Sequence, residues 1–310
     1  MSPKTKRSDL LKFHRPKLRL DSAPIPTLKP ESKLCLQTLA RYKPAKHWQK
    51  LVFPKSRSAA VLVALFVGRT GDLYVLLSRR SSTLRTYAGD TSLPGGKWEP
   101  GDRNLEWTAR REAFEEIGIP LDRQKVPLLC VLEPFLAGNQ LIVTPVVVLV
   151  LDKSIRPILN ESEVASIFSH PLKTLLHSEA PFPSEPETLE AKYHTFVDIN
   201  WTGHSGKVRM HRFLTGREAG GTKPIFGLTA SILIRVATIG YGYEPDFEVN
   251  APDQPAQEDR IVQALRTRPL FRQAEIEEGL DPDKVPDLVP REPPSNKRGR
   301  RNFSRLRSRL

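Results

Sequence analysis

The sequence has 310 residues, of which 39% are hydrophobic and 27% charged. This composition excludes a disordered chain that is too polar to bury a core, and it predicts a packed soluble domain. Its formal net charge of +13 is compatible with nucleic acid, an anionic membrane surface or a polyanionic small molecule as partner. The basic excess lies in Lys4–Arg19 and Lys297–Arg309, where a solvated basic tail is the simpler interpretation.

Cysteine content and hydropathy narrow the protein class further. Cys35 and Cys130 are the only cysteines, so we predict no disulfide framework, a reducing compartment, and a core position for both thiols. We predict no membrane span, because the most apolar stretch, Leu141–Leu151, is short and contains Pro145. The N-terminus also lacks the apolar core of a secretory signal.

The last three residues, Ser308-Arg309-Leu310, are a conservative variant of the Ser-Lys-Leu peroxisomal address. They predict a peroxisomal location reached through the peroxisomal import receptor. The mitochondrion and the cytoplasm are the alternatives. The basic N-terminus favours the mitochondrion, although Asp9 and early prolines interrupt the presequence pattern.

The first predicted elements are a helix and a hairpin. Apolar residues at helical spacing predict a helix over Ser32–Tyr42, with its first serine as N-cap. The apolar run Ala59–Val67 predicts a buried strand. Turn residues over Gly68–Asp72 then lead to the returning strand, Leu73–Ser78.

A loop, a helix and two strands come next. Gly95–Gly101 reads as a glycine-rich loop, and Asn104–Ile117 as one helix that Gly118 stops. Val126–Pro134 and Leu141–Leu151 predict strands joined by a Gly-Asn turn.

Glu161–Leu176 is predicted to begin as a helix, break at His170-Pro171 and resume. The later predicted elements are a hairpin from Lys192–Ile199 and Lys207–Leu214, an apolar helix over Gly227–Tyr241, and a short charged helix over Gln257–Arg266. The mixed order of strands and helices predicts one α/β or α+β domain over residues 32–242. A flexible basic arm over 1–31 precedes it, and a polar, proline- and arginine-rich extension over 243–310 follows.

The helix that Gly118 stops carries three glutamates on one face. Glu112, Glu115 and Glu116 stand at i, i+3 and i+4, where like charges destabilise an isolated helix by roughly a few tenths of a kcal/mol per pair. A divalent cation such as Mg²⁺ would remove that cost, because it prefers carboxylate oxygens. The opposite side is apolar and would seat the helix on a sheet through Leu105, Ala109, Ala113 and Ile117. A glutamate-rich solvent face is the plain alternative.

The residues around this helix favour a ligand site. Leu93–Lys97 contains two adjacent glycines, which allow backbone to approach a ligand or metal closely. Arg111 adjoins the acids and is suited to orient a carboxylate with two hydrogen bonds.

Together these residues resemble the Nudix box, through Gly96, Asp102, Arg111, Glu112, Glu115, Glu116 and Gly118. The resemblance implies an α/β/α sandwich with a mixed sheet and hydrolysis of nucleoside diphosphates linked to a second moiety. It implies Mg²⁺ (or Mn²⁺) held by the three glutamates and the Gly96 carbonyl, Arg111 orienting the glutamates, and Glu115 or Glu116 as base. Two departures stand out. Asp102 replaces a glutamate, and the gap from Asp102 to Arg111 is one residue longer than usual.

Those departures are shared with the coenzyme A diphosphatase subfamily, whose signature Leu76–Gly96 resembles without a gap. Ser78 replaces a threonine and Leu93 a phenylalanine, while Phe226–Ala230 resembles the start of that subfamily's last helix. The resemblance spans residues 34–242. It implies coenzyme A (CoA) and acyl-CoA as substrates. Planar, permanently charged guanidinium groups suited to their phosphates stand at Arg79, Arg80 and Arg85.

Weaker candidates and other functions remain open. Glu161 or Glu163 is expected either to approach the metal or to cap a helix start. The histidines His194, His204 and His211 are expected to be surface or structural. A Nudix hydrolase acting on oxidised nucleotides or ADP-ribose is the second reading. Nucleic-acid binding through the basic ends is the third, and the scarcity of aromatics there disfavours it.

Overall fold

The computed structural model describes residues 20, 23, 25–151, 157–179, 192–201 and 206–285. The basic N-terminal run, His204 and the C-terminal tripeptide therefore lie outside the described residues. Within the described ranges, no helix is both long and apolar enough to cross a membrane.

The fold contains two sheets and five α-helices in the part that is described. The helices are α1 (Pro30–Arg41), α2 (Leu105–Ile117), α3 (Gly227–Tyr241), α4 (Gln257–Thr267) and α5 (Pro269–Glu277). The strands are β1 (Ser58–Val67), β2 (Leu73–Arg80), β3 (Thr91–Ser92), β4 (Gly95–Lys97), β5 (Leu128–Val131), β6 (Phe135–Leu136), β7 (Ile142–Leu149), β8 (Val164–Pro171), β9 (His194–Asn200), β10 (Lys207–Phe213) and β11 (Ile225–Phe226).

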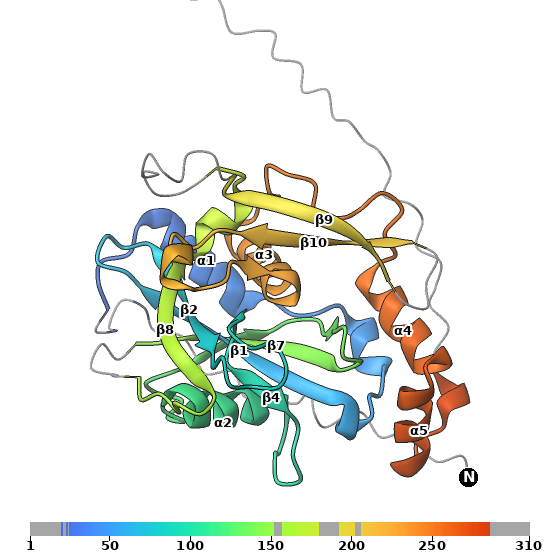
Figure 1. The fold of residues 1–310 in the computed structure, drawn as a ribbon. Coiled ribbons are helices and arrows are strands. Elements are labelled where there is room, and N and C mark those ends of the chain that lie inside the picture. The colour runs from blue at the N-terminus through green and yellow to red at the C-terminus, as the bar shows by residue number, and fades with distance from the viewer. Residues whose placement is uncertain are drawn as a thin grey trace, which may run out of the picture.

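The larger sheet is mixed and is built around β1. Its order is β3-β2-β1-β7-β5; β8 also pairs with β2, β4 with β1, and β6 with β7. β1 runs parallel to β7 and antiparallel to β2. The smaller sheet, in the order β11-β10-β9, lies on the far side of α3 from β1 (Figure 1).

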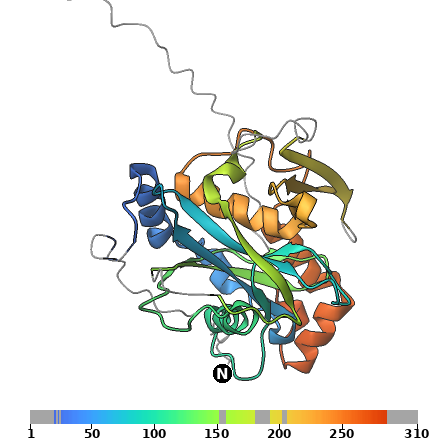
Figure 2. The same cartoon turned by 60° about the vertical axis from the view of Figure 1, so that its left-hand side comes forward.

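Alternation along β1 divides the core between two layers of helices. Ala60, Leu62 and Ala64 share one cluster with the apolar side of α2, whereas Val63 and Leu65 share another with α1 and α3. Successive strand residues point to opposite faces, so one strand supports both layers. Figures 1 and 2 show α2 on one side of the sheet and α1 and α3 on the other. The predicted α/β/α sandwich with a mixed sheet is confirmed.

Both cysteines are core residues, as predicted. Cys35 and Cys130 are fully buried. Cys35 lies where α1 crosses α3, and a side chain at Gly240 of α3 would collide with its sulfur. Glycine therefore permits the close contact of the two helices.

Packing continues past residue 242. α4 and α5 share a buried cluster with Trp48, Phe53 and Ile142, which lie in the predicted 32–242 domain. The Glu278 carboxylate accepts a hydrogen bond from the Lys55 N–H at 2.7 Å. The part of the 243–310 extension that is described therefore packs on the main fold, and α4 matches the predicted charged helix.

Three local predictions were wrong. Residues 164–171 form strand β8 rather than a helix, because they pair with β2, which is distant in sequence. Ser32 does not cap α1: the helix starts at Pro30, whose missing N–H is tolerated in the first turn, and Ser32 is buried. Part of the predicted glycine loop is strand β4, since Gly95–Lys97 pairs with β1.

Candidate active site

The acidic helix α2 has well-formed ends and a rigid support. The Asn104 side chain caps its start by accepting a hydrogen bond from the Trp107 N–H at 2.8 Å. Gly118 ends it with a left-handed φ of 70°. The four apolar residues predicted to seat the helix are all buried in one cluster with β1: Leu105, Ala109, Ala113 and Ile117. The glutamates therefore project from a fixed element.

Strand β4 brings backbone against the first of these glutamates. Gly96 pairs with Ala60 of β1, the strand on which α2 rests. A Cβ atom at Gly96 would collide with the Glu112 carboxylate. A glycine at this position therefore lets the loop and the carboxylate come together.

Glu116 is the most deeply buried of the three glutamates. It is 5% exposed, and its carboxylate accepts a hydrogen bond from the Gly95 N–H at 3.1 Å. Burial raises the pKa of Glu116 to about 8; the Gly95 hydrogen bond and Arg80 oppose this rise, while the charges of Glu112 and Glu163 add to it. Burial also raises the pKa of Glu112. Buried carboxylates such as these stay ionised at neutral pH only when a positive charge lies nearby.

Arg111 ties the acidic groups together. Its guanidinium donates twice to Asp102, from Nε and Nη2 at 3.0 Å each, and Nη2 also donates to the Lys97 carbonyl at 3.1 Å. Its Nη1 lies 3.1 Å from Glu112 and 3.0 Å from Glu115. Such planar, two-point pairing fixes orientation as well as charge.

Asp102 anchors Arg111 from the loop before the helix. It also accepts hydrogen bonds from the Glu99 N–H at 3.0 Å and the Thr108 hydroxyl at 2.9 Å. Burial pushes the pKa of Asp102 upward, but the hydrogen bonds from Arg111, Glu99 and Thr108 outweigh burial and hold it below its usual value. Asp102 is therefore an ionised anchor. The motif placed it near Arg111, whereas nothing in the sequence pointed to Thr108.

The donor set suits a hard divalent cation. In the described ranges, no three His, Cys, Asp or Glu side chains are already arranged to hold a metal ion. Arg111 holds Glu112 and Glu115, and Glu116 is bonded to Gly95. The site nevertheless offers two carboxylates that are largely removed from solvent and a third that is exposed, next to glycine backbone. These are the oxygen ligands that Mg²⁺ and Mn²⁺ prefer.

The predicted phosphate-binding arginines occupy two different places. Arg80 ends β2 with its Nη1 3.9 Å from the Glu116 carboxylate. Arg79, beside it on the strand, donates to the Gly220 carbonyl at 3.3 Å. Both have a buried Nε without a hydrogen-bond partner. Arg85 is exposed on the following loop. The structure thus brings Arg80 to the carboxylates and leaves Arg85 at the surface.

The two late glutamates differ in position. Glu163 lies close enough to Glu116 for its charge to raise the Glu116 pKa, and its carbonyl accepts from the Ser81 N–H at 2.7 Å. Glu161 is exposed. Neither caps a helix, because a strand follows them.

The described histidines of the predicted set, His194 and His211, lie away from the carboxylates. They are buried and hydrogen-bonded to each other at 2.9 Å; His194 stacks on Phe247, and His211 contacts the same ring at a tilted angle. Burial lowers the pKa of both, to about 4 for His194. Their position is structural.

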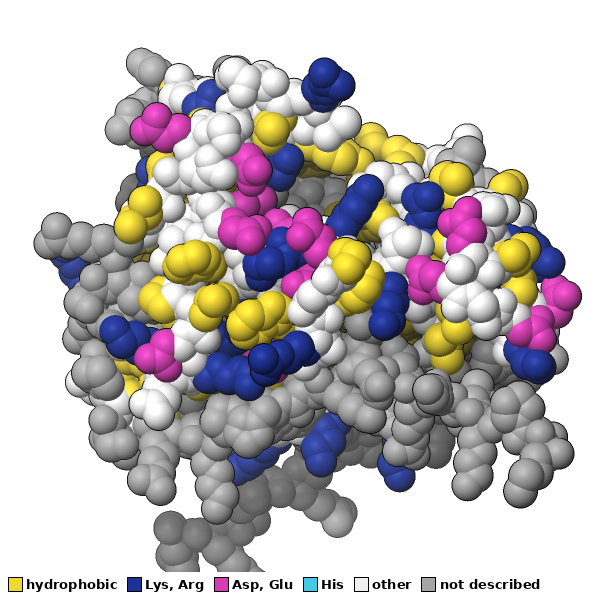
Figure 3. Space-filling model, turned by 90° about the horizontal axis from the view of Figure 1, so that it is seen from below, with side chains coloured by type: hydrophobic (Ala, Val, Ile, Leu, Met, Phe, Trp, Pro, Cys, Tyr) yellow, Lys and Arg dark blue, Asp and Glu magenta, His cyan; other side chains and the backbone are white. Residues whose placement is uncertain are grey.

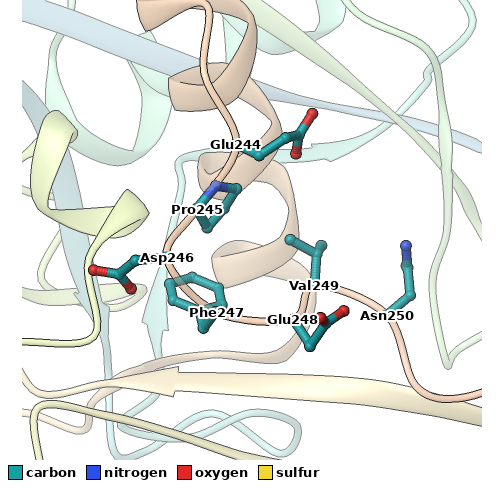
Figure 4. A pocket seen from close by; sticks show the side chains of 7 residues that line it. All are labelled: Glu244, Pro245, Asp246, Phe247, Glu248, Val249 and Asn250. Atoms are coloured by element: carbon teal, nitrogen blue, oxygen red, sulfur yellow. The ribbon is translucent and has the colours of Figure 1, made fainter. Parts of the chain in front are cut away.

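A pocket outside this region is lined by Glu244–Asn250, all from the segment between α3 and α4 (Figure 4). Three of its seven side chains are acidic: Glu244, Asp246 and Glu248. Such a lining repels a polyanionic ligand. By contrast, acidic and basic side chains gather together on the face of the molecule seen from below, where α2 lies (Figure 3).

Comparisons with known proteins agree with this geometry. A NUDIX domain model matches residues 55–212. The chain is 40% identical over 199 residues to Nudix hydrolase 15, mitochondrial, of Arabidopsis thaliana; the match covers 64% of this chain and 64% of that protein, so it spans less than two thirds of the relative.

A second relative is the peroxisomal coenzyme A diphosphatase 1 of Saccharomyces cerevisiae, 31% identical over 264 residues, which cover 68% of this chain and 78% of the yeast protein. A solved MutT/nudix family protein from Enterococcus faecalis superposes with a TM-score of 0.36 at 15% identity, covering 74% of this chain and 71% of that one. From the domain match over more than half of its length and the similarity to the yeast protein, the chain belongs to the Nudix hydrolase family.

Proposed function

We propose that this Nudix hydrolase cleaves the pyrophosphate bond of CoA and acyl-CoA in the presence of Mg²⁺ or Mn²⁺. The observation that carries the proposal is the position of Arg80, 3.9 Å from Glu116 at the end of the arginine-bearing strand. The guanidinium proposed to bind phosphate and a carboxylate proposed to bind the metal are therefore close enough to act on one pyrophosphate. The similarity to a yeast protein named as a CoA diphosphatase supports this substrate class.

Each residue of the site has a proposed task. Glu112, Glu115, Glu116 and the Gly96 carbonyl hold the metal, and Arg111 orients the glutamates. When bound, the metal neutralises charge on the pyrophosphate and favours attack by water. Either Glu115 or Glu116 accepts the proton of that water. Glu116 suits this role because its carboxylate is buried beside Gly95 and Arg80, at the position proposed for the pyrophosphate.

The arginines define the substrate. Arg80 pairs with the pyrophosphate beside the carboxylates, while Arg79 and the exposed Arg85 pair with the remaining phosphate charge of CoA. Guanidinium groups suit this because they stay charged and present paired donors. Hydrolysis then yields 3′,5′-ADP and 4′-phosphopantetheine or its acylated form.

The substrate claim is tested on the purified full chain with Mg²⁺ or Mn²⁺. CoA, acetyl-CoA, ADP-ribose and 8-oxo-dGTP are incubated separately and the products resolved by chromatography. We expect the two CoA compounds to be cut. Cleavage of ADP-ribose or 8-oxo-dGTP with CoA left whole contradicts the CoA assignment and favours the second reading.

The assignment of Glu116 has its own test. Glu116→Gln keeps the side-chain shape and the acceptor for the Gly95 N–H. We expect turnover to fall by about 100-fold or more, with the thermal unfolding midpoint kept, because the variant loses a metal ligand and a proton acceptor. Turnover near that of the parent protein contradicts the role.

We also propose that the protein is peroxisomal and is imported through Ser308-Arg309-Leu310. The tripeptide and the yeast relative's printed name support this location, whereas the Arabidopsis relative is named as mitochondrial. A fusion that masks Leu310 is expected to leave peroxisomes, while the same fusion at the N-terminus remains there. An unchanged distribution of the masked protein contradicts the proposal.

A further inference from the structure

Tyr87 is an exposed aromatic residue in an unfavourable backbone conformation. Its φ is 57°, in the left-handed region, and 55% of the residue is exposed. Among the described residues, the only other non-glycine residues with positive φ are Gln140 and Asp253. A bulky residue keeps such a conformation only where its surroundings impose it.

Lys223 and Asp90 impose it. The Lys223 ammonium donates to the Ala88 carbonyl at 2.8 Å and to the Asp90 carboxylate at 2.6 Å, and the Thr91 hydroxyl donates to the Lys223 carbonyl at 2.5 Å. The Asp90 N–H donates a hydrogen bond to the Tyr87 carbonyl at 3.1 Å, which closes the turn. A residue from a loop distant in sequence therefore clamps both sides of the turn. Nothing in the sequence pattern pointed to Lys223.

The clamped turn is attached to the rim of the active site. The Asp90 carbonyl accepts a hydrogen bond from the Arg80 N–H at 2.9 Å, and the Arg80 guanidinium lies 3.9 Å from Glu116. Through Asp90, the turn that carries Tyr87 is thus hydrogen-bonded to Arg80, which faces the proposed pyrophosphate position. The ring is neither buried nor engaged in a ring contact among the described residues, so the imposed conformation does not serve packing.

We infer that the Tyr87 ring stacks on the nucleobase of the substrate, which is the adenine of CoA. This inference rests on the proposed function, because it concerns the same substrate. An exposed aromatic ring on a loop tied to a proposed phosphate-binding residue is suited to hold a base by stacking, without hydrogen-bond readout. Tyr87 is therefore a specificity-determining residue that improves binding of adenine-bearing diphosphates.

The test pairs two variants with two substrates. Tyr87→Gly removes the ring and relieves the backbone strain, so the turn keeps its shape; Tyr87→Phe keeps the ring. CoA is compared with an analogue that carries the same ribose and phosphates but no base. We expect Tyr87→Gly to raise KM for CoA about tenfold with kcat changed less, and to leave KM for the base-free analogue unchanged. Tyr87→Phe restores the parent KM.

Tyr243→Ala serves as a control, because it removes another exposed tyrosine ring, which contacts His177 and Tyr241. We expect it to change the KM of neither substrate. An equal effect of Tyr87→Gly on both substrates, or none on CoA, overturns the inference.

Equilibrium binding of 3′,5′-ADP without turnover separates this inference from the proposed function. If the parent protein does not cut CoA but binds 3′,5′-ADP about tenfold more tightly than Tyr87→Gly does, the function is wrong and the stacking stands. If the parent and Tyr87→Gly bind the nucleotide equally, or neither binds it, the stacking is wrong whatever is cut.

Discussion

A single methyl group at Gly96 would probe the contact between backbone and carboxylate. The Gly96 φ is ordinary, so alanine adds no backbone strain there, but its Cβ would collide with the Glu112 carboxylate. Displacing Glu112 should weaken metal binding. We expect Gly96→Ala to raise the Mg²⁺ concentration for half-maximal rate by about tenfold or more, since a carboxylate ligand to Mg²⁺ is disturbed. Initial rates across a Mg²⁺ series measure this.

Gly138→Ala is the matched control, because its Cβ would meet nothing within 4 Å. It should leave both the rate and the metal requirement unchanged. If Gly96→Ala shows the parent metal requirement, then Glu112 is not a metal ligand or its carboxylate moves aside freely.

At the residue scale, the sequence showed which groups would share the site but not how they pair. Helical spacing predicted that Glu112, Glu115 and Glu116 face the same way, since spacing along a helix is fixed by geometry. That Glu116 is the buried member of the set depends on β4 and Gly95, which tertiary pairing brings there. The clamp from Lys223 is invisible locally for the same reason, because it crosses 133 positions to Asp90.

At the element scale, α2 depends on its cap. The Asn104 side chain satisfies the Trp107 N–H, one of the amides that no helical carbonyl reaches. We expect Asn104→Ala to lower the free energy of unfolding by about 1 kcal/mol. Asn104→Ser, which keeps a capping oxygen, should lose much less. Urea unfolding of both variants gives the comparison, and equal losses would argue against capping.

The elements that the sequence predicted well are those with local start and stop signals. α3 has the predicted bounds, since it runs from Gly227 to a left-handed Gly242, and the end of α2 at Gly118 was predicted likewise. β8 was missed because its inward residues, Val164, Phe168 and His170, also suit a helix over a short window. Only its long-range pairing with β2 makes it a strand.

At the scale of the whole molecule, His170 makes stability depend on pH. It is 1% exposed, its Nε2 is 2.8 Å from the Tyr193 hydroxyl, and burial lowers its pKa from 6.5 to about 4. The unfolded chain therefore binds more protons at this histidine between these values, so the contribution of His170 to stability is constant above about pH 6.5 and falls as the pH drops toward 4. The loss contributed by His170 is about 2 kcal/mol at pH 5.0. Unfolding in urea at pH 7.5 and 5.0 measures it.

His170→Gln isolates the contribution, because glutamine does not titrate. Any loss of packing in the variant lowers stability equally at both pH values, so the difference between the two pH values is the informative quantity. That difference should shrink relative to the parent protein. An unchanged difference would assign the pH dependence to other groups, of which the buried His194 is the first.

The C-terminal helices raise the question of whether the molecule unfolds as one unit. Phe271 of α5 is fully buried in a cluster with Trp48, Ile261 and Leu265, and so joins α4 and α5 to the main fold. We expect Phe271→Ala to lower the free energy of unfolding by about 3 to 5 kcal/mol, with a single transition. The neighbouring Leu270, 43% exposed, is the control, and its alanine variant should change stability by less than about 0.5 kcal/mol.

Hydrogen exchange distinguishes one cooperative unit from two. If α4 and α5 fold together with the sheet, Phe271→Ala accelerates exchange of the slowest amides in α2 and β1 as much as of those in α5, because all of them exchange through the same global opening. If the C-terminal helices open separately, only the amides of α4 and α5 respond, and the transition broadens. The contacts of Glu278 with Lys55 and Ser56, directly before β1, favour the first outcome. Confining the acceleration to α4 and α5 would instead support the predicted division between a domain over residues 32–242 and an extension that folds separately.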